Sequence, residues 1–197
     1  LQAFRDGDPN GNGIRDETRW DDPENELVLS CGVIGGITAY PGTGKTIAVT
    51  ISPQTGVVID SNGGGYFGPY LKFSGWDALE IQGKADRDVI IFIDGDEGRV
   101  TVEDAPLEAI DSHLVNRQLT EMYGRDDREK RAITVISAGQ AAEHVPMCGL
   151  NISYWDARRQ EVRIKQAARG GCGRVLRDKK IKAIVVKYSS MHADSNG

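Results

Sequence analysis

The 197-residue sequence has few cysteines, no excess of basic residues and no apolar run long enough to span a membrane. Cys31, Cys148 and Cys172 lie far apart and form no CxxC pair, so neither a disulfide framework nor a complete iron–sulfur or zinc motif is present. The net charge of −5 argues against a nucleic-acid binder, which needs a basic face for phosphates. We therefore expect a globular protein of one domain, or two small ones, in the reducing cytoplasm, without a membrane span or signal peptide.

Apolar runs typical of strands are separated by Gly-rich turns and short helical patterns. The β-rich runs cover residues 27–34, 46–51, 56–60, 78–83, 88–95, 99–104, 132–137 and 181–188. Apolar spacing predicts helices over 66–73 and 107–123, the second ended by Gly124. Because strands and helices do not alternate as regular β-α-β units, we predict an α+β fold, with a frayed tail over 189–197.

An internal echo predicts duplicated, β-rich half-domains with short helices. A glycine, a leucine and an alanine recur with the same spacing: Gly68, Leu71 and Ala78, then Gly173, Leu176 and Ala183. Each set follows a glycine cluster, "NGGG" at 62–65 and "RGGCG" at 169–173. We interpret the two units as Gly-rich loop, helix and strand, with one similar loop in each half.

The three consecutive glycines at 63–65 precede an apolar helical pattern. Consecutive glycines carry a backbone entropy cost that a close approach or a positive φ can justify. A Gly-rich turn at a helix start leaves backbone N–H groups free to meet an anion. The alternative is a tight turn before a core helix.

The stretch "AYPGTGKT", residues 39–46, fits a loose P-loop spelling. A P-loop needs a helix directly after its lysine, whereas "IAVTISP" is β-branched and ends at Pro53. A nucleotide hydrolase is therefore the least favoured function. Lys45 is either a phosphate contact at a strand edge or a solvated surface charge.

Several motifs together resemble the N-terminal domain of the tungsten-containing aldehyde:ferredoxin oxidoreductases. They are "DDPEN" (21–25), "SPQTG" (52–56), "SNGGGYFGPYLKFSGWDALEIQGKA" (61–85), "ARGGCG" (168–173) and "DKKIKAIVV" (178–186), in family order and with similar spacing. The resemblance implies an α+β duplication, here over 22–188, that forms the base for a tungsten or molybdenum bis-pterin cofactor. It also implies that magnesium bridges the two pterin phosphates, with one loop for each pterin.

The resemblance assigns individual site residues. The two magnesium-binding backbone carbonyls fall on Asn62 and Gln166, and the glycine beside the phosphate falls on Gly64. The two arginines that contact the pterins fall on Lys45 and Lys165, where lysine keeps the charge but loses the planar bidentate fork. The residues expected at the cofactor are Lys45, Asn62, Gly63, Gly64, Gly65, Lys165, Gln166, Ala167, Arg169, Gly170 and Gly171.

The resemblance also implies what the rest of the enzyme supplies. The family's [4Fe–4S] ligands and catalytic acid and base have no counterpart in this sequence, and we expect them on a further domain or a partner chain. The whole enzyme would oxidise aldehydes to carboxylic acids and pass electrons to ferredoxin. Residues 150–163 look longer than the family segment. The second hypothesis, favoured by the two Arg→Lys changes, is a non-catalytic binding or assembly protein that kept the fold.

Three local expectations follow. Residues 62–65 and 166–171 should face one another across one ligand site. A platform without its covering domains should expose a large apolar face around Tyr66, Phe67 and Tyr70. Glu143 and His144 form a capped turn more readily than a catalytic pair.

The polar segment 1–21 contains "DGDPNGNGIRDE" at 6–17, outside the resemblance. One frame, with Asp6, Asp8, Asn10 and Glu17, fits an EF-hand-like calcium loop. A second frame starts at Asp8 and uses Asn10, Asn12 and Asp16. The alternative to a structural calcium site is a solvated, Asx-rich turn.

Overall fold

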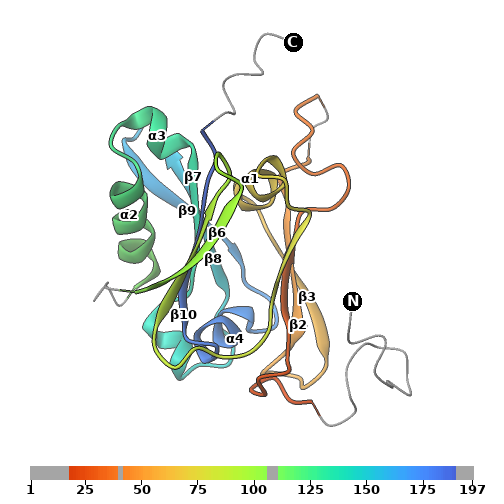
Figure 1. Cartoon of the computed structure of the whole chain (residues 1–197). Coiled ribbons are helices and arrows are strands. Elements are labelled where there is room, and N and C mark those ends of the chain that lie inside the picture. The colour runs from red at the N-terminus through yellow and green to blue at the C-terminus, as the bar shows by residue number, and fades with distance from the viewer. Residues whose placement is uncertain (1–17, 40–41, 106–110, 190–197) are drawn as a thin grey trace.

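The protein is described from a computed structural model over residues 18–39, 42–105 and 111–189. Two β-sheets pack face to face (Figure 1). Two short helices, α1 (Phe67–Phe73) and α4 (Cys172–Asp178), lie towards opposite ends of the space between the sheets, and α2 (Ser112–Tyr123) covers the outer face of the larger sheet. The proposed calcium ligands at 6–17 lie outside the described residues.

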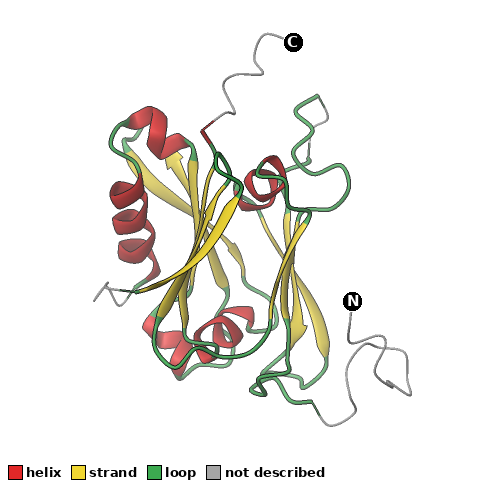
Figure 2. Ribbon diagram, viewed as in Figure 1, coloured by secondary structure: helices red, strands yellow, loops and turns green. Residues whose placement is uncertain are grey.

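The strands form one four-stranded sheet and one six-stranded sheet (Figure 2). The smaller sheet has the order β3-β2-β1-β4, and the larger has the order β6-β5-β10-β7-β8-β9. Their bounds are β1 Leu27–Ser30, β2 Thr46–Ile51, β3 Val58–Gly63, β4 Ala78–Ile81, β5 Val89–Asp94, β6 Arg99–Asp104, β7 Ile133–Ser137, β8 Leu150–Asp156, β9 Glu161–Ala167 and β10 Ile181–Lys187. The remaining elements are α3 Asp127–Arg131 and the short 3-10 helix η2 Gln140–Glu143.

The topology confirms the α+β class and contains a duplication. The chain β1-β2-β3-α1-β4 folds as an antiparallel sheet of order β3-β2-β1-β4, and β7-β8-β9-α4-β10 folds in the same order, β9-β8-β7-β10. Even the register repeats, because Ser30 lies opposite Ala78 in the first unit and Ser137 lies opposite Ala183 in the second. We call these units repeat 1 and repeat 2. The hairpin β5–β6 extends the sheet of repeat 2, with β5 parallel to β10.

Local sequence explains where the helices begin and end. Helix α1 carries Pro69 in its first turn, where a missing N–H costs nothing. Helix α2 is capped by the Asp111 side chain, which accepts the Leu114 N–H at 2.8 Å. It ends at Gly124, as the sequence predicts. Helix α4 starts after Gly171, which has a φ of 80°.

One apolar core lies between the sheets and a second lies beneath α2. The larger core joins both repeats and contains Phe67, Leu71, Ile152, Ile184 and Leu176, all at most 1% exposed. The predicted apolar surface around Tyr66 is therefore wrong: Phe67 and Tyr70 are 0% and 3% exposed, because α1 packs its apolar face between the sheets. Tyr66 alone is exposed, at 45%.

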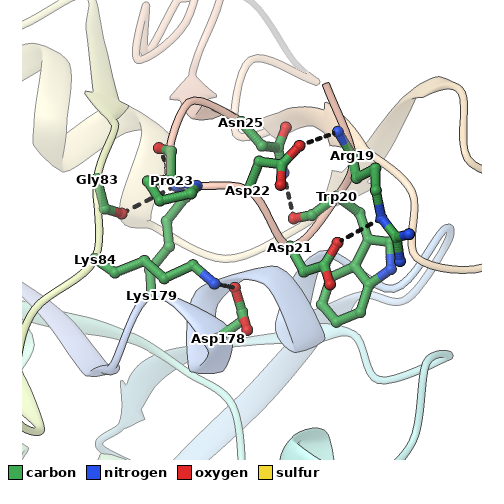
Figure 3. Close-up of polar contacts among 10 residues, drawn as sticks. All are labelled: Arg19, Trp20, Asp21, Asp22, Pro23, Asn25, Gly83, Lys84, Asp178 and Lys179. Atoms are coloured by element: carbon green, nitrogen blue, oxygen red, sulfur yellow. Dashed lines mark hydrogen bonds and ion pairs between the residues drawn. The ribbon is translucent and has the colours of Figure 1, made fainter. Parts of the chain in front are cut away.

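The turn at residues 19–25 is held by hydrogen bonds near the end of α4 (Figure 3). The buried Lys179 ammonium donates to the Gly83 carbonyl at 3.1 Å and lies 3.5 Å from that of Pro23. The Asn25 amide donates to the Trp20 carbonyl and accepts the Ile51 N–H. The motifs "DDPEN" and "DKKIKAIVV" thus meet in space, which gives both a structural role.

Two strands of the structure were not predicted from the sequence, and a third is longer than predicted. Strands β8 and β9 fall in 150–167, where apolar and polar residues alternate but form no continuous apolar run. Strand β3 continues through Asn62 and Gly63, which the glycine run indicated as loop. Within the described residues, no helix is both long and apolar enough to cross a membrane.

Candidate functional site

The two glycine loops lie against one another where the edges of the two sheets meet. A Cβ on Gly63 would lie 3.2 Å from the backbone nitrogen of Ala167 and 2.5 Å from Ile152 Cδ1. The Arg169 N–H donates to Ser61 Oγ at 3.0 Å, which ties the second loop to β3. The structure therefore brings segments 62–65 and 166–171 together.

Asn62 and Gln166 occupy the same position in the two repeats. Asn62 lies opposite Ile47, one pair from the end of β3, and Gln166 lies opposite Asn151, one pair from the end of β9. Both strands are sheet edges, so alternate backbone groups point away from the sheet. The repeat therefore places Asn62 and Gln166 at equivalent positions near the ends of two edge strands.

The side chains of these two residues are already engaged. The Asn62 amide donates to Asp60 Oδ2 at 3.0 Å, and the Gln166 amide donates to Asn151 Oδ1 at 2.9 Å. These contacts hold each side chain within its own sheet edge.

Most glycines of the two loops are required by the fold itself. Gly65 and Gly170 have φ of 102° and 69°, a region that L-residues rarely adopt. A Cβ on Gly171 would lie 2.0 Å from the Pro146 carbonyl oxygen, and one on Gly173 would lie 2.3 Å from that of Gly149. The "RGGCG" glycines thus let segment 146–149 cross the start of α4.

Gly44 and Gly64 differ from these glycines, because neither the backbone conformation nor close packing requires glycine at their positions. Neither has a positive φ, and an added Cβ would meet nothing closer than 3.6 Å: the Gly65 carbonyl oxygen for Gly44, and the Lys165 Cγ for Gly64. Packing within the chain does not require glycine at either position. Both flank the same region, so an external group that approaches the backbone there is a sufficient reason for them.

Two exposed lysines border this region. Lys165 lies on β9, with its stem against Gly64, and Lys45 immediately precedes β2 next to Gly44. The Lys45 carbonyl packs against Gly68 at the start of α1. Because Lys45 leads into strand β2 and not into a helix, the local structure is not that of a P-loop.

A surface cavity of about 700 Å³ lies beside strand β9. It is lined by His113, Val162, Ile164, Lys165, Gln166 and Ala168 among others.

Three neighbours of the candidate site were not predicted from the sequence: His113, Asn151 and Gly44. The repeat could have indicated Asn151, because it pairs with Gln166 as Ile47 pairs with Asn62.

Cys31, Cys172 and Glu143 have structural roles. Cys31 and Cys172 are buried, and burial raises the pKa of the Cys172 thiol to about 11. Glu143 accepts from the buried Arg177 guanidinium, which also binds Asp88 at 3.1 Å. No group of three His, Cys, Asp or Glu side chains is placed to hold a metal ion within the described part of the chain.

The sequence matches the family model "Aldehyde ferredoxin oxidoreductase, N-terminal domain" over residues 12–188. The chain belongs to this family. It is 36% identical over 169 residues to the tungsten-containing aldehyde ferredoxin oxidoreductase of Thermococcus kodakarensis, covering 85% of this chain and 25% of the relative. It is 30% identical over 170 residues to the WOR-like subunit of an aliphatic sulfonate oxidoreductase of Pyrococcus furiosus, covering 84% of this chain and 26% of that subunit.

A solved structure shares the fold. The active-site complex BamBC of benzoyl coenzyme A reductase with 1,5-dienoyl-CoA matches with a TM-score of 0.70 and 30% identity, over 87% of this chain and 24% of that one. The chain thus spans about a quarter of the length of the relatives that it matches. In this family it corresponds to the N-terminal domain.

Proposed function

We propose that this chain is the cofactor platform of a tungsten or molybdenum bis-pterin oxidoreductase. The observation that carries the proposal is the pair of glycines, Gly44 and Gly64, that the fold does not require and that lie between two exposed lysines. A surface without Cβ atoms and flanked by positive charge fits an anionic phosphate held by backbone N–H groups.

The duplication also supports a cofactor with two pterins. A cofactor with two similar pterin halves fits a site with two similar loops. The edge strand of each repeat, β3 in repeat 1 and β9 in repeat 2, ends at the candidate site. The backbone carbonyls of Asn62 and Gln166 would hold the magnesium ion between the pterin phosphates. Lys45 and Lys165 would each contact the phosphates as point charges.

The bound cofactor would supply the redox chemistry, while this chain would bind and orient it. Residues 62–65 and 166–171 would fix the positions of the two pterins, and the buried core beneath them would keep that surface rigid. The complete protein would oxidise an aldehyde and pass electrons through a [4Fe–4S] cluster to ferredoxin in the cytoplasm. The cluster ligands and the catalytic acid and base would lie on further domains or a partner chain.

A non-catalytic binding or assembly protein is the second candidate. The specific observation in its favour is that lysine stands at both positions where the family resemblance places arginine. Lysine cannot form the bidentate contact, so the chain would keep the platform surface without retaining the cofactor. A structural calcium site in segment 6–17 is compatible with either function.

The two functions are separated by the composition of the natively purified protein with any chains that accompany it. Elemental analysis for tungsten and molybdenum, together with a fluorescent pterin assay, should find one metal to about two pterins. Magnesium should be retained after exhaustive dialysis. A preparation without tungsten, molybdenum and pterin contradicts the platform function and supports the binding protein.

A further inference from the structure

Strand β6 forms an exposed edge of the six-stranded sheet. It pairs with β5 on one side, and in the described structure no strand pairs with its other side (Figure 1). Its valines lie opposite the core residues of β5: Val100 opposite Ile93, and Val102 opposite Ile91. Ile93 and Ile91 are 1% and 8% exposed, whereas Val100 and Val102 are 42% and 67% exposed. The apolar face of the sheet therefore continues past the core to an open edge, which is a template for a further strand.

The sequence of β6 is complementary to itself. When two copies of one strand pair antiparallel about a twofold axis, directly opposite residues point to the same face of the sheet. The axis must then lie midway between the two copies of one residue, and each register is named by that residue. An axis through Thr101 places Val100 opposite Val102 of the second copy, and Arg99 opposite Glu103. The valines meet on one face and the opposite charges meet on the other, twice in each dimer.

Neighbouring registers lack this match. An axis through Val102 would place Val100 opposite Asp104, and Thr101 opposite Glu103. An axis through Val100 would place Gly98 opposite Val102. Each of these arrangements leaves a valine without an apolar partner and Arg99 without a carboxylate. The sequence therefore selects the register centred on Thr101.

The contacts within the chain leave the charged groups available. Arg99 lies 2.9 Å from Glu97, and both side chains are 60% exposed, so the guanidinium retains donors for a second carboxylate. Glu103 accepts from Thr101 and Tyr123 at 2.9 and 3.1 Å, which orients its carboxylate on the exposed edge. Each carboxylate oxygen can accept a further hydrogen bond.

We propose that β6 pairs antiparallel with β6 of a second copy of this chain, in the register centred on Thr101, and joins the two six-stranded sheets into one. The proposal does not depend on the cofactor. The contact is small, so the dimer should dissociate on dilution. It is an isologous contact that closes on itself and protects the edge from open-ended aggregation.

The test uses charge exchange at the seam, measured by sedimentation velocity over a range of concentrations. The 197-residue chain of 21.5 kDa should show reversible dimerisation. Arg99→Glu and Glu103→Arg should each raise the dissociation constant at least about ten-fold, because each places like charges opposite one another twice. An equimolar mixture of these two variants should dimerise again, since every opposed pair then has opposite signs.

Arg163→Glu is the matched control. Arg163 lies on β9, at the other end of the same sheet, and pairs with Glu161 as Arg99 pairs with Glu97. This variant has the same charge change and should dimerise like the wild type. A monomer at all concentrations overturns the proposal, as does a dimer that the single substitutions leave unchanged. Failure of the mixture to dimerise overturns the register.

Discussion

Repeat 1 and repeat 2 have the same topology but differ in what covers and extends them. Within the described residues, the outer face of repeat 2 is covered by α2 and α3, and its sheet is extended by β5 and β6, while no described element covers or extends repeat 1 in this way (Figure 1). The positions where the repeats meet remain similar: Asn62 and Gln166 are equivalent in register, and Gly63 and Ala167 end the two edge strands. The two repeats are therefore closely alike where they meet at the candidate site.

The helix starts show the same contrast at single residues. With Gly68 and Gly173 aligned, Tyr66 precedes α1 with a φ of −110°, and Gly171 precedes α4 with a φ of 80°. Repeat 1 tolerates a large side chain at this position, while repeat 2 has backbone in its place. The two glycine loops therefore serve the fold to different degrees.

The largest effect is expected for Gly171→Ala. It combines a left-handed φ with a Cβ 2.0 Å from the Pro146 carbonyl oxygen, and should lower the free energy of unfolding by about 4 kcal/mol or prevent folding. Tyr66→Ala, at the equivalent position, loses ring contacts with Tyr70 and Tyr154 and should cost about 1 kcal/mol. Urea denaturation of both variants checks the difference, and equal losses would contradict the contrast between the repeats.

Arg177→Met should have the next largest effect. Arg177 is 6% exposed and holds Asp88 and Glu143, whereas the equivalent Lys72 is a partly exposed side chain that donates to the Gly32 and Val33 carbonyls. Loss of the buried guanidinium leaves two carboxylates unpaired and should cost about 3 kcal/mol. Lys72→Met should cost less than about 1 kcal/mol. Thermal denaturation at pH 7 measures both, and a more damaging Lys72→Met would reverse the expected order.

A smaller, pH-dependent difference is expected at Cys172, which is equivalent to Phe67. Burial raises the pKa of Cys172 from 9.0 to about 11, so the folded state keeps a proton that the unfolded chain loses. Its contribution to stability is present below pH 9 and is lost as the pH rises towards 11, by at most about 3 kcal/mol. Cys172→Ala should therefore flatten the decline in unfolding free energy between pH 9 and 11. Parallel curves for the variant and the wild type would show that the thiol does not titrate as expected.

Sequence patterns predicted the elements whose signals are local. The spacing in 66–73 predicted α1, and the turn residues after Asp94 predicted the β5–β6 hairpin. Strands β8 and β9 were missed although apolar and polar residues alternate in both, as in Leu150, Asn151 and Ile152 of β8 and Val162, Arg163 and Ile164 of β9. The signal was overlooked because neither strand is a continuous apolar run.

The roles of the glycines depend on contacts between distant segments, which no local pattern encodes. Gly171 is fixed by Pro146, while Gly64 meets only a lysine stem. Helical spacing likewise identified the apolar face of α1 but not the sheets that bury it. The family resemblance supplied the candidate residues, and the structure separates those that the fold requires from those that it leaves open.

The most direct test of the platform function is the cofactor content of Gly64→Ala in the natively purified protein. The added methyl group meets no chain atom closer than 3.6 Å, so the free energy of unfolding should change by less than about 0.5 kcal/mol. The same methyl group would occupy the surface proposed for a pterin phosphate, so pterin and metal content should fall at least about ten-fold. Wild-type pterin and metal content in an equally stable variant would contradict the assignment of this surface to the cofactor.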